Sequence, residues 1–95
     1  MAGYVIAEVQ VTDPERYAEY REQVNAGILA YGGRFLARAN PAQVYDNAVA
    51  QRVVLIEFPS VAAAVAAHDS PAYGKALEAL GDAVDRDIRI VEGAE

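Results

Sequence analysis

Residues 52–60, RVVLIEFPS, contain the clearest structural signal in the chain. The run from Arg52 to Phe58 is short, apolar and rich in β-branched residues, and this composition is typical of a β-strand. Pro59 ends the strand, and the side chain of Ser60 is suited to cap a following helix. The stretch therefore predicts a strand that leads directly into a helix.

The beginning of the chain repeats this order. Residues 3–11, GYVIAEVQV, alternate as a strand does, and Asp13 or Thr12 can cap a helix that has Pro14 in its first turn. A Gly-Gly pair at 32–33 ends this helix. Apolar residues at spacings of three and four form one stripe along it: Tyr17, Tyr20, Val24, Ile28 and Tyr31.

Further segments follow from the same signals of composition and capping. The sequence predicts a strand over 34–39, a turn over 40–42, a short alanine-rich helix through Ala67, a helix that restarts at Ser70-Pro71, and a last strand over 87–92. Residues 43–46 either extend the strand before them or form a short strand of their own, and 47–51 form a loop.

The resulting order, β-α-β-β-α-β, is that of an α+β, ferredoxin-like fold, with a four-stranded antiparallel sheet and both helices on one face. The 95 residues suit a single domain over 1–95. A faint repeat relates YVIAEV to VVLIEF, and the pseudo-twofold axis of this fold makes Glu8 and Glu57 equivalent positions on one side of the sheet.

Composition excludes several classes of function. The 14 acidic and 8 basic residues give a net charge of −6, and the basic residues are scattered, so we expect no binding to nucleic acid. The absence of cysteine excludes disulfides, zinc–thiolate sites and iron–sulfur clusters. A single histidine argues against a metal site, and we expect no cofactor. With no signal peptide and no membrane-length apolar run, we expect a cytoplasmic protein.

The two faces of the predicted sheet carry different residues and therefore need different partners to cover them. One face suits the helices: Val5, Ala7, Val9, Val11, Val54, Ile56, Phe58, Ile88 and Ile90. The other is too apolar to face water yet holds charged groups: Tyr4, Ile6, Glu8, Val53, Leu55, Glu57, Arg89 and Val91. We therefore predict a homodimer in which two copies pack sheet to sheet and enclose a barrel-like space.

The segments GYVIAEVQVTDPERYAEY, YGGRFLAR, VVLIEFPS, SPAY and IVEG, in this order and spacing, resemble the domain of unknown function family DUF1330. That resemblance covers essentially the whole chain. It implies a dimeric α+β barrel, a superfamily that includes small cofactor-free monooxygenases and isomerases. The chain has Ala67 and His68 where members commonly have an aromatic pair, and Leu80 where an arginine is common. The resemblance thus implies a smaller and less basic pocket.

His68 has two interpretations. Its ordinary pKa makes it a candidate general base. The alternative, which we favour, is a histidine at a helix C-terminus, where the helix dipole favours its protonated form. Adjacent helical residues do not face each other, so Asp69 does not orient the ring. The replacement of an aromatic residue keeps a pocket-lining role open for His68.

Glu8 and Glu57 are the candidate carboxylates of the barrel. They suit a general acid/base pair or a cation site, and Glu57 is the stronger catalytic candidate. The interpretation that we favour is structural: salt bridges to Arg89, Arg34 or Arg38 that fix the register of the dimer.

Two functions follow from these residues. The first is a small-molecule-binding homodimer, whose ligand lies in the barrel against Tyr4, Glu8, Arg34, Tyr45, Glu57, His68, Tyr73 and Arg89. The second is a cofactor-free isomerase or monooxygenase acting on a small aromatic or carbonyl compound. There Glu57 is the acid/base, Tyr4 and Tyr45 orient the substrate, and His68 or Arg34 gates or polarises it.

Overall fold

Strand β1 (Gly3–Val11) lies inside the sheet and pairs with a strand on each side. The structure is a computed structural model, and it describes residues 1–48, 50–81 and 84–94. The order of strands is β2-β3-β1-β4, with every pair antiparallel. The other elements follow in chain order: α1 (Pro14–Ala30), β2 (Arg34–Ala39), β3 (Arg52–Phe58), α2 (Val61–His68), α3 (Pro71–Leu80) and β4 (Val84–Glu92).

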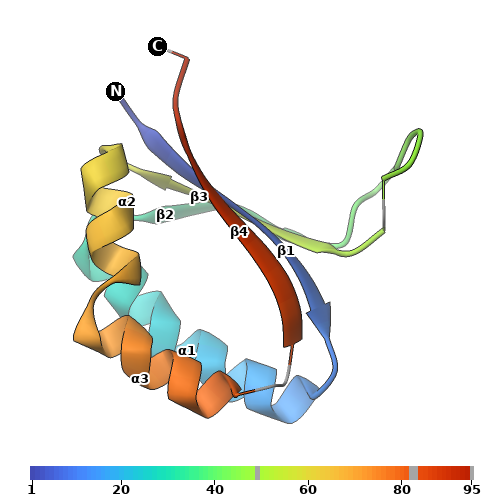
Figure 1. Cartoon of the computed structure of the whole chain (residues 1–95), viewed down its shortest axis with the longest axis horizontal. Helices are drawn as coiled ribbons and strands as arrows, with labels where there is room; N and C mark the ends of the chain where they lie inside the picture. Colours follow the sequence, from blue (N-terminus) through green and yellow to red (C-terminus); the bar gives the residue numbers. More distant parts are fainter. Residues whose placement is uncertain (49, 82–83, 95) are drawn as a thin grey trace.

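All three helices cover one face of the sheet and leave the other face open (Figure 1). This arrangement confirms the predicted β-α-β-β-α-β order, with the second helical region divided into α2 and α3. Strand β4 begins at Val84, three residues earlier than predicted. Residues 43–46 form no strand, since a turn occupies Asp46 and Asn47, and residue 49 of the predicted loop lies outside the described residues.

Short polar side chains start the helices. The carboxylate of Asp13 accepts a hydrogen bond from the Arg16 backbone N–H at 3.3 Å, so Asp13 is the cap of α1. Ser60 caps α2 and Ser70 caps α3 in the same way. Each bond satisfies a backbone donor that the first turn of a helix leaves free.

The core lies between the helices and the covered face of the sheet. Among its fully enclosed side chains are Val5, Phe58 and Leu80. The predicted stripe of α1 is buried through Ile28, but the prediction for Tyr31 was wrong: this residue caps the helix and is 38% exposed. The helix ends before a further turn can bring Tyr31 over the sheet.

A β-bulge changes the orientation of side chains in β2. Arg34 pairs with Glu57 and Phe35 pairs with Ile56, but the next pair is Ala37 with Leu55. Because Leu36 is the extra residue, the alternation reverses, and Arg38 lies on the helix-covered face. Simple alternation would place Arg38 with Arg34.

The open face carries the residues predicted for it. Tyr4 lies between Glu57 and Val91 in the register, and Ile6 lies between Leu55 and Arg89. These side chains are half-buried or exposed in the single chain. No helix among the described residues is long and apolar enough to span a membrane.

Candidate functional site

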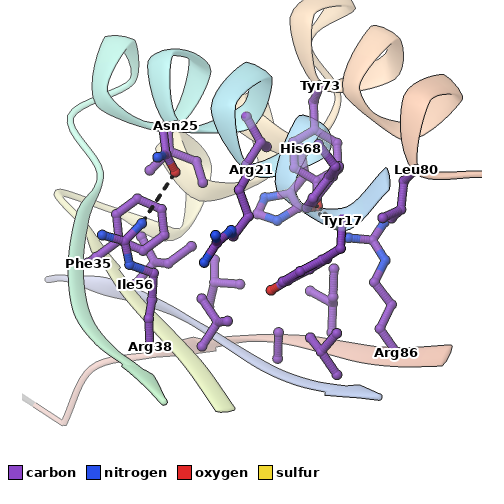
Figure 2. A pocket seen from close by; sticks show the side chains of 18 residues that line it. Tyr17, Arg21, Asn25, Phe35, Arg38, Ile56, His68, Tyr73, Leu80 and Arg86 are labelled. Atoms are coloured by element: carbon purple, nitrogen blue, oxygen red, sulfur yellow. Dashed lines mark hydrogen bonds between the residues drawn. The ribbon is translucent and has the colours of Figure 1, made fainter. Parts of the chain in front are cut away.

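A cavity of about 50 Å³ lies between the helices and the covered face of the sheet. Most of its wall is apolar and comes from β1, β3 and α1, as in the side chains of Val5, Ala7 and Val24. Figure 2 shows Asn25 and Arg38 at one end of this pocket and Arg86 and Leu80 at the other. The space holds a few water molecules or a short apolar group, since one water needs roughly 10–15 Å³.

Two tyrosines and an arginine meet at one side of the cavity. The phenol oxygens of Tyr20 and Tyr73 are 3.0 Å apart. Nη1 of Arg86 donates to both, at 3.0 Å to Tyr20 and 2.8 Å to Tyr73. The three residues come from α1, α3 and β4, so this triad also ties three elements together.

The hydrogens of this triad exceed its internal bonds. Nη1 of Arg86 carries two hydrogens, and each phenol carries one. Two bonds run from Arg86 to the phenols, and a third joins Tyr20 to Tyr73. One phenol hydrogen therefore has no partner among the described residues, and both tyrosines line the cavity.

Burial sets the protonation of the triad. It is the main reason why the pKa of Tyr20 is raised above its usual value, and the nearby Tyr73 adds to the effect, while Arg86 opposes it. Burial alone would lower the pKa of Arg86, but the two phenol oxygens more than offset this and raise it. At neutral pH the site therefore offers a neutral phenol beside a fixed positive charge.

His68 lines the same cavity from the last turn of α2. Its Nδ1 lies 2.9 Å from the carbonyl oxygen of Ala64. Since a carbonyl only accepts, Nδ1 carries a hydrogen, and Nε2 is the nitrogen left to take a proton. The ring also packs on Tyr73, with the ring centres 4.6 Å apart.

Two of the residues that differ from the family pattern, His68 and Leu80, line this cavity. Ala67 is buried, and Leu80 lines the cavity on the same side as Arg86 (Figure 2). Leu80 adds no charge, but Arg86 supplies a guanidinium from the neighbouring strand β4. The expectation of a less basic pocket did not take the positive charge of Arg86 into account.

Beside the cavity, two larger hollows adjoin α1. One, of about 580 Å³, is lined by Tyr17, Arg21 and Arg52, and the other, of about 460 Å³, by Arg21, Arg38 and Arg52. Tyr17 and Arg21 also line the cavity, so the first hollow and the cavity share a wall. None of these three spaces is lined by Glu57.

A separate cluster occupies the open face. Arg34 donates to one carboxylate oxygen of Glu57 at 2.6 Å, and the Tyr4 hydroxyl donates to the other at 3.0 Å. This hydrogen bond to Glu57 is the main cause of the raised pKa of Tyr4, and the carboxylate charge adds to it. Of the predicted ion pairs for Glu57, the structure contains the one to Arg34.

The prediction that Arg38 pairs with these carboxylates was wrong, because the bulge places it on the other face. There its guanidinium lies 4.0 Å from the centre of the Phe35 ring and donates to Asn25 at 3.4 Å. Within the part of the chain that the structure describes, no ion pair joins Glu8 or Arg89 to another residue.

The structure thus divides the predicted ligand residues between two faces. His68 and Tyr73 lie at the cavity, whereas Tyr4, Arg34 and Glu57 meet on the open face. Glu8 and Arg89 share the open face but pair with Val53 and Ile6 across neighbouring strands. Tyr45 is 74% exposed, in the segment between β2 and β3.

Sequence reasoning missed Arg86, Arg52 and the site role of Tyr20. Strand alternation contains a signal for the arginines, since Arg86 has the same parity as Ile88, and Arg52 the same parity as Val54. Within residues 1–48, 50–81 and 84–94, no group of three or more His, Asp or Glu side chains is arranged to hold a metal ion.

The model of the family described as a domain of unknown function (DUF1330) matches residues 2–94. The chain belongs to this family. The DUF1330 match covers both the cavity and the open-face cluster, so the two sites lie inside the family domain. No functionally curated protein matches the chain.

Solved structures place this DUF1330 chain among ferredoxin-like proteins. A protein of unknown function from Rhodopseudomonas palustris, RPA0582, aligns over 99% of this chain and 83% of its own, with a TM-score of 0.78 and 19% identity. A dimeric ferredoxin-like protein of unknown function from Jannaschia sp. CCS1 aligns over 98% and 100%, with a TM-score of 0.75 and 12% identity.

A third similar structure is SnoaB, a cofactor-independent oxygenase from Streptomyces nogalater. It aligns over 99% of this chain and 94% of its own, with a TM-score of 0.67 and 12% identity. At these identities the likeness shows a shared fold, the ferredoxin-like α+β architecture, and activity is a separate question.

Proposed function

We propose that this protein is a homodimer that binds a small molecule in the cavity between its helices and its sheet. The observation that carries the proposal is the Tyr20–Tyr73–Arg86 triad, which has one unused phenol hydrogen and lines a cavity whose wall is mostly apolar. A small-molecule site combines apolar walls with a few fixed polar groups in this way. The free hydrogen suits a carbonyl or other acceptor oxygen of the ligand.

This proposal moves the ligand from the barrel to the helix side of the sheet. The hollows described here adjoin α1, and the cavity contains two of the predicted ligand residues, His68 and Tyr73. Both carboxylate oxygens of Glu57 already accept hydrogen bonds. We assign Tyr4, Arg34 and Glu57 to the dimer interface, where they fix its register.

The open face supports the dimer. It places Ile6, Leu55 and Val53 at the surface of the single chain, and apolar patches of this kind mark interfaces. The similar protein from Jannaschia is described as dimeric and aligns over its whole length. A twofold axis through this face would cover the apolar side chains of both copies.

Native mass spectrometry of the purified protein tests both parts of the proposal. We expect a dimer that carries a reproducible small mass. We expect the double variant Tyr20→Phe/Tyr73→Phe, which removes the free phenol hydrogen whichever ring carries it, to weaken the binding of that ligand about fivefold or more, since a hydrogen bond of this kind contributes about 1 kcal/mol or more. Tyr45→Phe is the matched control, because Tyr45 lies outside the cavity. A ligand retained equally by both variants would contradict the assignment of the site.

A second candidate function is a cofactor-free isomerase or monooxygenase that acts on a small aromatic or carbonyl compound. The observation that favours it is the position of His68, whose Nε2 is available as a base at the same cavity as the phenol donor. The oxygenase SnoaB shares the fold. If this chain is an enzyme of this kind, we expect a His68→Gln variant to bind the ligand but to lose turnover.

Oxygen uptake and changes in the absorbance spectrum of small hydroxyaromatic compounds together separate the two functions, because a monooxygenase consumes oxygen whereas an isomerase changes the substrate without consuming it. Turnover that falls at least a hundredfold in His68→Gln supports the enzyme, given the usual contribution of a general base of roughly 10²–10⁴. Loss of turnover in Glu57→Gln, with the dimer intact, would instead return catalysis to the open face. Binding of a ligand without any turnover would support the first function, a protein that binds a small molecule without converting it.

A further inference from the structure

Three arginines from different elements converge beside the cavity. Arg21 comes from α1, Arg38 from β2 and Arg52 from the first position of β3. All three line the hollow of about 460 Å³, and Arg21 and Arg52 also line the hollow of about 580 Å³. In a chain with a net charge of −6, this is a local concentration of positive charge.

Aromatic rings hold these guanidinium groups in place. Arg21 and Arg52 lie 5.5 Å and 6.0 Å from the centre of the same Tyr17 ring. Arg38 lies 4.0 Å from the centre of the Phe35 ring. Contacts of this kind position a cation without neutralising it, so the groups remain free to bind an anion.

No carboxylate of the described residues forms an ion pair with this cluster. None of the three arginines forms an ion pair with a residue in 1–48, 50–81 or 84–94; the ion pair of Arg34 with Glu57 lies on the other face. Glu22 also lines the smaller hollow, but it is exposed and forms no ion pair with them. Like charges gathered without a partner favour the binding of an anion.

Arg52 gives an independent indication of the same ligand. Its Nε is buried and has no hydrogen-bond partner among the described residues. Buried donors are nearly always satisfied, and each exception calls for an explanation such as a missing water, ion or ligand. A ligand bound in the adjoining hollow would satisfy this hydrogen if the guanidinium turned to present its Nε to an acceptor oxygen.

We propose that Arg21, Arg38 and Arg52 bind the carboxylate of a small ligand whose apolar body reaches into the cavity. This inference rests on the proposed function and specifies its ligand class. The planar guanidinium fork matches the two oxygens of a carboxylate. Tyr17 and Arg21 line both spaces, so a ligand held at the arginines lies next to the apolar wall.

Titration followed by NMR tests the inference, with the Nε–H signals of the arginines as probes. We expect butyrate, whose short chain suits the cavity, to shift the signal of Arg52, and butyramide, its neutral analogue, to bind at least tenfold more weakly. Arg52→Gln should weaken butyrate binding about tenfold or more, because hydrogen bonds to charged groups contribute enough for that factor. Lys75→Gln is the control: it removes one positive charge from the exposed surface of α3.

Several outcomes would overturn the inference. Equal binding of butyrate and butyramide would remove the need for an anion, and inorganic phosphate binding as tightly as butyrate would assign the cluster to oxoanions without an apolar body. If Arg52→Gln does not fold, the exposed Arg21→Gln takes its place with the same expected loss. An unchanged affinity in the folded variant contradicts the site.

A cavity-filling variant, Ala7→Val, distinguishes the failure of this inference from that of the proposed function. Weaker butyrate binding in both Ala7→Val and Arg52→Gln supports the inference. Weaker binding in Ala7→Val alone contradicts the arginine site and leaves the cavity as the ligand site. Weaker binding in Arg52→Gln alone contradicts the apolar body in the cavity, and with it the proposed function, although an anion still binds at the arginines.

Discussion

At the scale of single residues, the triad of Tyr20, Tyr73 and Arg86 shows how a charge can be kept within a largely apolar interior. The guanidinium donates to two neutral phenols, so its nearest partners are dipoles and not carboxylates. Neutral partners leave the positive charge available to a ligand. This arrangement requires both phenols to remain protonated, so the site is sensitive to alkaline pH.

The pKa of Tyr20 predicts the direction of that sensitivity. Its value in the folded protein is raised above the ordinary 10.0, mainly by burial. The contribution of the neutral phenol to stability is therefore fully present below about pH 10 and is lost as the pH rises toward the folded value. We expect the free energy of unfolding, measured with urea between pH 8.5 and 11, to fall more steeply in the wild type than in Tyr20→Phe.

The comparison uses slopes because Tyr20→Phe also removes hydrogen bonds at neutral pH, at a cost of about 1–2 kcal/mol. Tyr45→Phe is the control, since that side chain is 74% exposed and makes no contact with the triad. Parallel slopes in the wild type and Tyr20→Phe would show that Tyr20 is not the group responsible.

At the scale of elements, the junction between α2 and α3 depends on one serine more than on the other. Ser70 is buried, accepts from the Tyr73 backbone N–H at 3.2 Å and donates to the Ala67 carbonyl at 2.7 Å. Ser60 accepts a single bond, from the Ala63 backbone N–H at 3.0 Å. Ser70 thus closes helix α2 and begins helix α3.

Replacing each serine by alanine should separate these roles. We expect Ser60→Ala to lower the free energy of unfolding by about 1 kcal/mol, the usual cost of a lost helix cap. Ser70→Ala should cost about 2 kcal/mol, since it also leaves a buried carbonyl without that donor. Thermal and urea unfolding measure both; equal losses would mean that the second bond contributes nothing.

Element positions followed from the sequence more completely than the orientation of side chains did. Capping residues and β-branched runs located the helices and most strand ends, because these signals are local. The bulge at Leu36 is set by pairing with β3, a long-range contact, so alternation placed Arg38 on the wrong face. The triad likewise joins residues 53 and 66 positions apart, and no local pattern specifies such a meeting.

At the scale of the whole molecule, the two faces of the sheet carry different groups. Its covered face holds the cavity and the arginine cluster, and its open face holds apolar side chains around the ion pair of Arg34 with Glu57. Burying that face would also shield the ion pair from water, where exposed pairs contribute little. Changes on the open face should therefore alter assembly and leave the cavity in place.

Leu55 provides the test of this separation. It pairs with Ile6 in the middle of the open face, so Leu55→Lys would place a charge at the centre of the proposed interface. We expect this variant to become monomeric in light scattering at micromolar concentration while its circular dichroism stays native. Val65→Lys is the matched control, because Val65 is 41% exposed on α2, away from that face. If Leu55→Lys keeps the mass of a dimer, the interface lies elsewhere; if the wild type is itself a monomer, the open face needs another partner.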